Sequence, residues 1–248
     1  MLKRLIQSFL LRFGYYLKSS RRFGEDHWQD LVTLAASPKP GRDRVIFDVG
    51  AHQGQTLAAA GRYFPEAAIH CFEPDPSSVE ILRAAAAARP KARIHAFALG
   101  AAPGSADFHR NRESMTNSLL PTSIGGLSGE YGVLSATDEV IQVPVRTLDE
   151  FCEEQGIAFI DLLKTDCQGY DLKVLEGGER MLANHTIGVI TCEVIFDDEY
   201  EGQGRYHELM AFLDARGYRF MGFQNMARNA ALECTFCDAV FRRPPSAS

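Results

Sequence analysis

Strand-like and helical patterns alternate along this chain from Arg44 almost to its end, and this alternation is the strongest restriction on its fold. Apolar runs of strand length are separated by segments with helical periodicity, which is typical of a parallel sheet whose strands are joined by crossover helices. At 46% hydrophobic residues over 248 positions, the chain can bury a core of that size in one domain. We predict strands at 44–49, 67–73, 92–98, 160–165, 187–194, 218–223 and 235–241, and helices at 54–63, 76–88, 170–183 and 205–216.

Two segments depart from this alternation. Residues 101–146 are rich in Gly, Ser and Thr, and they predict short strands with a mobile loop inserted into the domain. The last two predicted strands are separated only by the short polar stretch 224–231, so we expect an antiparallel hairpin there. Residues 41–248 are thus predicted to form a Rossmann-like α/β domain with a mostly parallel seven-stranded sheet, helices on both faces and an antiparallel strand in the C-terminal hairpin.

Residues 1–40 are predicted to be a separate N-terminal segment that starts with a basic amphipathic helix. Apolar residues recur at helical spacing over 1–24, and the positions between them hold six basic residues and no acid. A helix packed on the domain or on a second subunit, as in a homodimer, is the simpler interpretation, and attachment to an anionic membrane surface is the alternative. The apolar run is interrupted by polar residues and lacks a cleavage site, so we expect a cytoplasmic protein without a transmembrane segment.

Charge and cysteine content restrict the partners. The formal net charge is −6 although the first 24 residues are basic, so the remainder is more acidic still and would repel a phosphate backbone. We therefore expect a small-molecule or glycan partner and no nucleic acid. The six cysteines lie mostly in apolar runs, which favours a reducing compartment. Cys234 and Cys237 form a lone C-x-x-C motif that we interpret as core residues, with a zinc or redox role as the alternative.

The segment VIFDVGAHQGQT, residues 45–56, leads directly from a predicted strand into a predicted helix. Gly50 and Gly54 allow a tight turn and a close approach of the backbone to a ligand, and the N–H groups at the start of the helix attract an anion. A dinucleotide fingerprint requires glycine two positions after Gly50, where this chain has His52. The turn therefore favours a nucleoside with a carboxylate, such as S-adenosylmethionine, over a diphosphate, and Ala51, His52 and Thr56 are predicted to contact it as well.

Acidic residues end the first two predicted strands. Asp48 is placed to bind the ammonium group of the cofactor and to favour its sulfonium charge. Glu73, followed by Pro74, is placed to accept hydrogen bonds from both ribose hydroxyls. Helix capping or solvation is the structural alternative for each acid. Together, one crossover apart, they indicate an S-adenosylmethionine site.

Several motifs in this order resemble the FkbM-type methyltransferase family over residues 44–223. They are DVGAHQGQT, CFEPDP, FALG, RTLDEFCEEQGI, DLLKTDCQGYDLKVLEGG and CEVIFDDEYEGQ. The resemblance implies a class I methyltransferase fold, S-adenosylmethionine as donor, and transfer to a hydroxyl oxygen, often of a sugar or polyketide-type molecule. It also implies that Asp48, Gly50 and Glu73 bind the cofactor and that Ala98 and Leu99 line the adenine. Gln168 and Tyr170 depart from the family, which usually has an acid and a small residue at those positions.

An alcohol is a poor nucleophile until its proton leaves, so a general base or a metal ion is expected beside the acceptor oxygen. Asp166 ends the fourth predicted strand and Glu193 lies near the end of the fifth, so both are expected to face the cleft, where Asp166 would also contact the cofactor. His52 and His109 are the other candidate bases, although a lone histidine is more often structural. Lys164 is interpreted as a member of a structural ion pair.

Polar residues in the less regular segments are candidates for acceptor binding. We predict this role for Asn117 and Ser118 in the insertion and for Asp197 and Tyr200 after the fifth strand. The oxygen ligands of 197–199 suit Mg²⁺, but a solvated turn is the simpler interpretation, so no metal site is predicted. Three alternatives stay open: N- or C-methylation on the same fold, a catalytically silent nucleoside-binding module that docks through the N-terminal helix, and a nicotinamide-dependent oxidoreductase.

Overall fold

The computed structural model describes residues 6, 9–10, 12–13, 23–35, 42–124 and 132–244. Most of the amphipathic helix predicted over 1–24 lies outside the described residues, and so do residues 125–131 of the predicted insertion, where a mobile loop was expected. Within the described part of the chain, no helix is long and apolar enough to cross a membrane.

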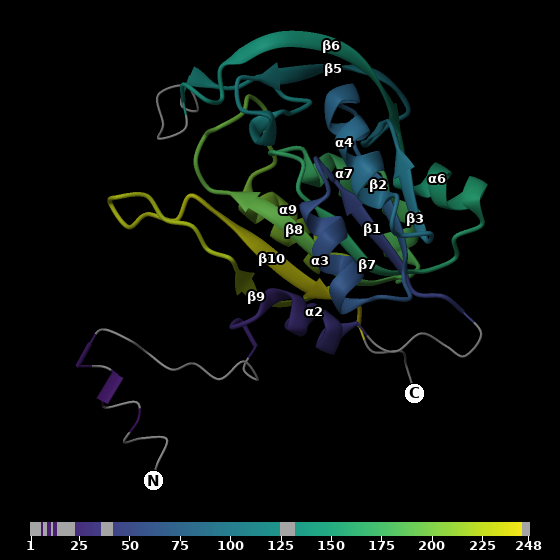
Figure 1. The fold of residues 1–248 in the computed structure, drawn as a ribbon, viewed down its shortest axis with the longest axis horizontal. Helices are drawn as coiled ribbons and strands as arrows, with labels where there is room; N and C mark the ends of the chain where they lie inside the picture. Colours follow the sequence, from purple (N-terminus) through teal and green to yellow (C-terminus); the bar gives the residue numbers. More distant parts are fainter. Residues whose placement is uncertain are drawn as a thin grey trace.

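The described residues contain a seven-stranded sheet in the order β3-β2-β1-β7-β8-β10-β9 (Figure 1). All strands run parallel except β10, which pairs antiparallel with both β8 and β9. This confirms the predicted class I methyltransferase topology and its C-terminal hairpin. The strands are β1 (Val45–Val49), β2 (Ala68–Phe72), β3 (Ala92–His95), β7 (Ile160–Thr165), β8 (Ile187–Ile195), β9 (Arg219–Gln224) and β10 (Phe236–Arg242).

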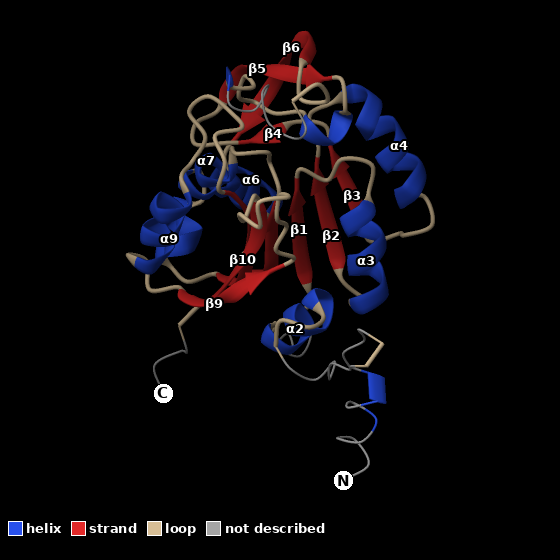
Figure 2. Ribbon diagram, turned by 90° about the vertical axis from the view of Figure 1, so that its left-hand side faces the viewer, coloured by secondary structure: helices blue, strands red, loops and turns tan. Residues whose placement is uncertain are grey.

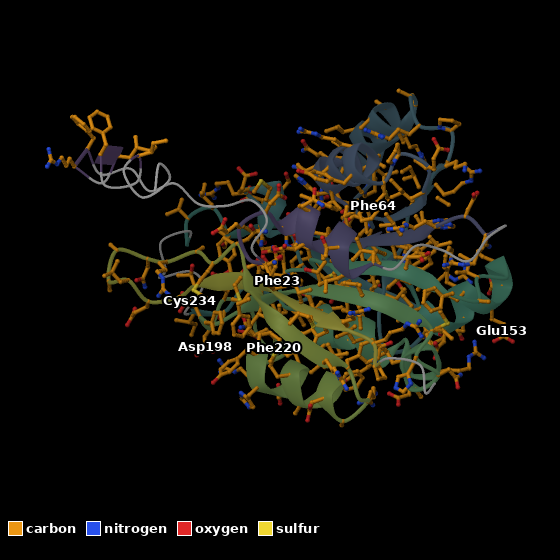
Figure 3. All side chains as sticks on the ribbon, turned by 90° about the horizontal axis from the view of Figure 1, so that it is seen from below. Phe23, Phe64, Glu153, Asp198, Phe220 and Cys234 are labelled. Carbon is orange, nitrogen blue, oxygen red and sulfur yellow. The ribbon has the colours of Figure 1, made fainter. Side chains whose placement is uncertain are left out.

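Helices cover both faces of this sheet (Figure 2). On one face α3 (Gln55–Tyr63) and α4 (Pro76–Ala86) lie beside β1 and β2, with α2 (His27–Leu34) below them. The other face carries α6 (Leu148–Gln155), α7 (Asp171–Glu176), α8 (Glu179–Ala183) and α9 (Tyr206–Asp214). Two separate apolar clusters fill the two interfaces, and Figure 3 shows Phe64 on the α3 side and Phe220 on the α9 side of the sheet.

The order of the strands determines where a ligand can bind. Strand β1 lies between β2 and β7, so the chain leaves β1 toward one side of the sheet and later returns to its other side. In open parallel sheets such a switch point leaves a crevice at the carboxyl ends of the strands. Asp48 on β1 pairs in register with Cys71 on β2 and with Lys164 on β7, so the loops after these three strands meet there.

The insertion forms a roof over this edge of the sheet. The roof consists of β4 (Ala98–Leu99), which precedes the insertion, and of β5 (Gly104–Asn111), the short 3₁₀ helix η1 (Ser114–Thr116) and β6 (Thr137–Arg146) within it. Its strands pair in the order β4-β6-β5 (Figure 2). The prediction of short strands was wrong here, because β5 and β6 form an extended antiparallel pair. Arg110 on β5 ties the roof to the start of α4 through an ion pair of 3.0 Å with Asp75.

Three helical features differ from the sequence-based expectation. Helix α6 was not predicted, although Thr147 and Glu150 form a capping box at its start. Helix α2 falls in the segment 1–40 but packs on the domain, where its Asp30 accepts a hydrogen bond of 2.6 Å from Gln224 on β9. The predicted helix 170–183 is divided into α7 and α8. Gly177 lies between them, and a Cβ there would lie 2.0 Å from the carbonyl oxygen of Gly100, which follows β4.

Candidate active site

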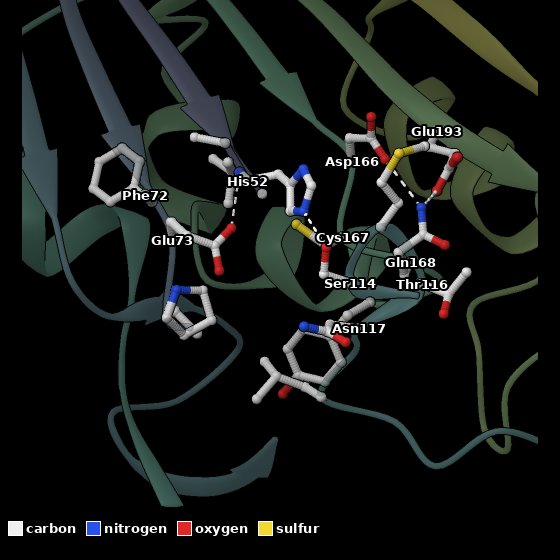
Figure 4. A pocket seen from close by; sticks show the side chains of 18 of the residues that line it. His52, Phe72, Glu73, Ser114, Thr116, Asn117, Asp166, Cys167, Gln168 and Glu193 are labelled. Carbon is white, nitrogen blue, oxygen red and sulfur yellow. Dashed lines mark hydrogen bonds between the residues drawn. The ribbon is translucent and has the colours of Figure 1, made fainter. Parts of the chain in front are cut away.

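A pocket of about 640 Å³ lies between the carboxyl ends of the strands and the roof. This volume is in the range of about 300–1,000 Å³ that is typical of small-molecule and cofactor sites. Residues from the loops after β1, β2, β7 and β8 line it, and Ser114 and Thr116 of η1 lie across the pocket from the strand ends (Figure 4). Phe72 and Glu73 lie on one side of the pocket, and Asp166, Gln168 and Glu193 lie on the other.

The turn after β1 has the tight geometry that its glycines predicted. Gly50 has φ 80°, and a Cβ there would lie 1.9 Å from the carbonyl oxygen of Asp166. Gly54, at φ 98°, is the N-cap of α3 and is not among the residues that line the pocket. The first intrahelical bond runs from the Ala58 N–H to the Gly54 carbonyl, so the N–H groups of residues 55–57 have no acceptor within the helix. Thr56 is among the lining residues, so this helix start faces the pocket.

Glu73 reaches the pocket as predicted, with two backbone contacts that fix its carboxylate. One oxygen accepts a hydrogen bond of 2.8 Å from the His52 N–H, and the other accepts one of 2.8 Å from the Asp75 N–H. Burial raises the pKa of Glu73 to about 7, although these two bonds oppose the rise. Each carboxylate oxygen retains a further lone pair for a ligand hydroxyl. The apolar residues around it are Ala51, Phe72, Pro74, Ala98 and Leu99.

Asp48 is fully buried and is not among the residues that line the pocket. Neither carboxylate oxygen has a well-formed hydrogen bond within the described residues, and the Lys164 ammonium lies 3.9 Å from one of them. Burial raises the pKa of Asp48 to about 6, against the opposing effects of Lys164 and the Thr56 hydroxyl. The structure therefore places Asp48 behind two lining residues, Thr56 and Lys164, rather than at the pocket surface.

Two carboxylates face each other on the other side of the pocket. The Gln168 amide donates hydrogen bonds of 3.3 Å to Asp166 and 3.0 Å to Glu193, and Lys164 donates one of 2.9 Å to Asp166. Burial alone would raise the pKa of Asp166, but Lys164 and the hydrogen bonds outweigh it and hold the pKa below its ordinary value. Burial and the nearby Asp166 charge raise the pKa of Glu193 far above its ordinary value. Burial and the Asp166 charge therefore favour the protonated form of Glu193, whereas Lys164 favours the ionised form of Asp166.

The other candidate bases lie in different surroundings. His52 lines the pocket, and its Nε2 is 2.9 Å from the hydroxyl of Ser114 in the roof. His109 is on β5, where its backbone pairs with Ser118, and its side chain is not among those that line the pocket. The geometry thus brings His52, but not His109, to the site.

Of the four predicted acceptor-binding residues, only Asn117 lines the pocket, and its side chain also accepts a hydrogen bond of 2.7 Å from the Asn111 N–H. Ser118 is buried and donates to the Gln168 carbonyl at 2.8 Å. Asp197 is exposed, in the same loop as Asp198 (Figure 3). Tyr200 is buried beside the pocket, and its hydroxyl contacts Gln168.

Sequence reasoning missed several lining residues. Lys164 forms the predicted ion pair but also lines the pocket, and Gln168 was noted only as a departure from the family pattern. Nothing in the sequence indicates that Met115 and Leu134 of the roof, or Phe236 of β10, reach the site. The described residues contain no group of three or more His, Cys, Asp or Glu that could hold a metal ion. Cys237 is buried in the core and Cys234 is partly buried in the loop before it.

Comparison with known proteins identifies the family of this chain. The chain is 29% identical over 180 residues to the 2-O-methyltransferase NoeI of Sinorhizobium fredii, with 71% of each chain covered. It is 30% identical over 154 residues to the 31-O-demethyl-FK506 methyltransferase FkbM of Streptomyces tacrolimicus, covering 54% of this chain and 59% of that protein. Among solved structures it is similar to a precorrin-6y C5,15-methyltransferase of Geobacter metallireducens, with a TM-score of 0.46 and 12% identity, covering 94% of this chain and 95% of that one.

The family model of the methyltransferase FkbM domain matches residues 48–220 of this chain. The chain belongs to this FkbM family and is an S-adenosylmethionine-dependent methyltransferase.

Proposed function

We propose that this protein methylates a hydroxyl oxygen of a small-molecule or glycan acceptor. The observation that carries the proposal is a single pocket with Glu73 on one side and, on the other, Asp166 and Glu193 bridged by the Gln168 amide. The names of the two relatives, a 2-O-methyltransferase and a 31-O-demethyl-FK506 methyltransferase, support oxygen as the methylated atom.

The residues on the Glu73 side fit the donor. The carboxylate of Glu73 has lone pairs for two ribose hydroxyls, and the apolar side chains around it suit an adenine ring. The N–H groups at the start of α3 suit the carboxylate of the amino acid part. Asp48 lies behind this side of the pocket with the Lys164 ammonium 3.9 Å from its carboxylate, so no direct donor contact is assigned to it. When bound, S-adenosylmethionine supplies a methyl group that is electrophilic because it is attached to a sulfonium.

Asp166 is assigned the role of general base. It is ionised because Lys164 stabilises its charge, and it faces the pocket where an acceptor hydroxyl can approach. In the reaction the acceptor oxygen forms a bond to the methyl carbon as the carbon–sulfur bond breaks, and the hydroxyl proton passes to the carboxylate. The products are a methyl ether and S-adenosylhomocysteine, and the proton leaves to solvent from Asp166.

The charges around the pocket restrict the acceptor. The acidic lining residues are Glu73, Glu113, Asp166, Glu193 and Glu199, and Lys164 is the one Lys or Arg among the lining residues that the structure describes. A phosphate or carboxylate beside this set would be repelled. A neutral polyol or sugar is therefore the proposed acceptor class, and nucleic acid is disfavoured.

The test is to incubate the protein with S-adenosylmethionine labelled with ¹³C in the methyl group and with a fractionated metabolite extract. We expect a labelled product whose ¹³C chemical shift is that of a methyl ether. In Asp166→Asn, kcat should fall by about 10²–10⁴-fold, while S-adenosylhomocysteine still binds. Label attached to nitrogen or carbon would overturn the proposal of O-methylation, and an unchanged kcat in Asp166→Asn would overturn the role of the base.

A further inference from the structure

Gln168 lies in a strained turn that directs its side chain between the two carboxylates. Its backbone has φ 51°, which is uncommon for a residue other than glycine, and Gly169 follows with φ 85°. The turn is held in place because Ser118 donates to the Gln168 carbonyl at 2.8 Å and the Gly204 N–H donates to the Gly169 carbonyl at 3.1 Å. Strain that the surrounding structure maintains often marks a functional position.

The side-chain amide of Gln168 has partners at both ends. Its nitrogen donates to Asp166 and Glu193, and its oxygen accepts a hydrogen bond of 2.9 Å from the Tyr200 hydroxyl. Tyr200 is 3% exposed, and its single hydroxyl proton is shared between the Gln168 amide oxygen and the Thr116 carbonyl in the roof, which is also 2.9 Å away. Burial and the Glu199 charge raise the pKa of Tyr200, so its hydroxyl remains a donor. With the amide oxygen directed at Tyr200, the amide N–H groups face the carboxylates.

We infer that Gln168, oriented by Tyr200, is a positioning residue that holds the Asp166–Glu193 pair with one proton and with Asp166 as the free carboxylate. This inference rests on the proposed role of Asp166 as the base and explains how that role is maintained. A glutamate at position 168 would place a third carboxylate beside the other two, whereas the neutral amide donates to both. The amide also lies between the two acids and the roof, because Tyr200 contacts η1.

Other charged groups act on the pair, and the test must keep them constant. Lys164 and Asp48 approach Asp166 from β7 and β1, and Asp171 and Asp238 act on Glu193 from α7 and β10. None of them is changed in the variants below, so a shift in the titration reports on the amide and on Tyr200.

The test is an infrared pH titration of protonated carboxyl groups, which requires no acceptor. The variants are Gln168→Met, which removes the amide at similar length, and Tyr200→Phe, which removes only the hydroxyl. Gln155→Met and Tyr206→Phe, at exposed positions outside the pocket, are the matched controls. Difference spectra against Asp166→Asn and Glu193→Gln assign the bands. Circular dichroism and S-adenosylhomocysteine binding establish that each variant is folded.

In the wild type, one carboxyl of the pair should remain protonated at neutral pH, and the second should become protonated only in acid. Loss of a donor to a charged carboxylate raises its pKa, so this acid step should move to higher pH by about one unit or more in Gln168→Met. It should move in the same direction, and less, in Tyr200→Phe, and not at all in the controls. Folded variants with an unshifted acid step would overturn the inference. Failure to find a methyl ether product would overturn the proposed function alone, because the titration does not depend on the acceptor.

Discussion

Replacing Glu73 with Gln tests the donor side of the pocket. The carboxylate accepts two backbone N–H bonds of 2.8 Å and is 5% exposed, so the substituted amide keeps the shape of the side chain but loses its charge. The NH₂ group of the new glutamine must face the backbone N–H of either His52 or Asp75, and that buried N–H then has no acceptor. This should lower the unfolding free energy by about 1–3 kcal/mol. The Glu73→Gln side chain also has only one oxygen that can accept a ribose hydroxyl, whereas the Glu73 carboxylate has two.

The loss of one hydrogen bond to a charged acceptor is worth about 1.5–3 kcal/mol, so S-adenosylhomocysteine should bind roughly 10–150-fold more weakly. The assay is isothermal titration calorimetry above pH 7, where Glu73 is ionised, since burial raises its pKa to about 7. Glu66→Gln is the matched control, because Glu66 is exposed and not among the lining residues. Folded Glu73→Gln with an affinity within twofold of the wild type would refute the assignment of Glu73 to the ribose.

Two further predictions concern the stability of the protein without ligand. Gly50→Ala should lower the unfolding free energy by about 2–5 kcal/mol, because Gly50 has a positive φ and its new Cβ would clash with the Asp166 carbonyl. The control Gly156→Ala, also at positive φ but with open space around it, should lower the unfolding free energy by only about 1–2 kcal/mol. Equal losses for the two variants in denaturant titrations would argue against the close approach of Gly50 to Asp166. Burial raises the pKa values of Asp48, Glu73 and Asp171 to about 6, about 7 and about 7, and it lowers those of His70 and His95 to about 4. The three carboxyls bind protons in the folded state that the unfolded state releases and outweigh the two histidines, which act in the opposite direction, so stability should fall as the pH rises from about 5 to about 7. Chemical denaturation at several pH values checks this, and a rise in stability across the same range would contradict it.

The sequence was sufficient to predict the sheet and the donor side of the pocket. Strand β8 (Ile187–Ile195) is buried along most of its length and is a nearly continuous apolar run, which is easily recognised in a sequence. Gly50 and Glu73 follow directly from strand ends, so their positions are determined by local chemistry and by the rule that ligands bind at the switch point of a parallel sheet.

The roof and the acceptor side could not be predicted in the same way. Strands β5 and β6 pair across a long intervening segment, and their alternation is weak because much of each strand is exposed. Tyr200 contacts Gln168 because the irregular loop after β8 places it there. No periodic sequence pattern predicts the path of such a loop. Asp48 ends a strand as expected, but its side chain lies within the wall of the pocket because Thr56 and Lys164 cover it.

A crystal structure of the protein with S-adenosylhomocysteine tests the central claim most directly. We predict that the ribose hydroxyls contact the Glu73 carboxylate, that the amino acid carboxylate lies at the start of α3, and that the sulfur faces Asp166 and Glu193. A nucleoside bound outside this pocket, or bound in it with the sulfur turned away from the two carboxylates, would contradict the proposed arrangement of donor and base.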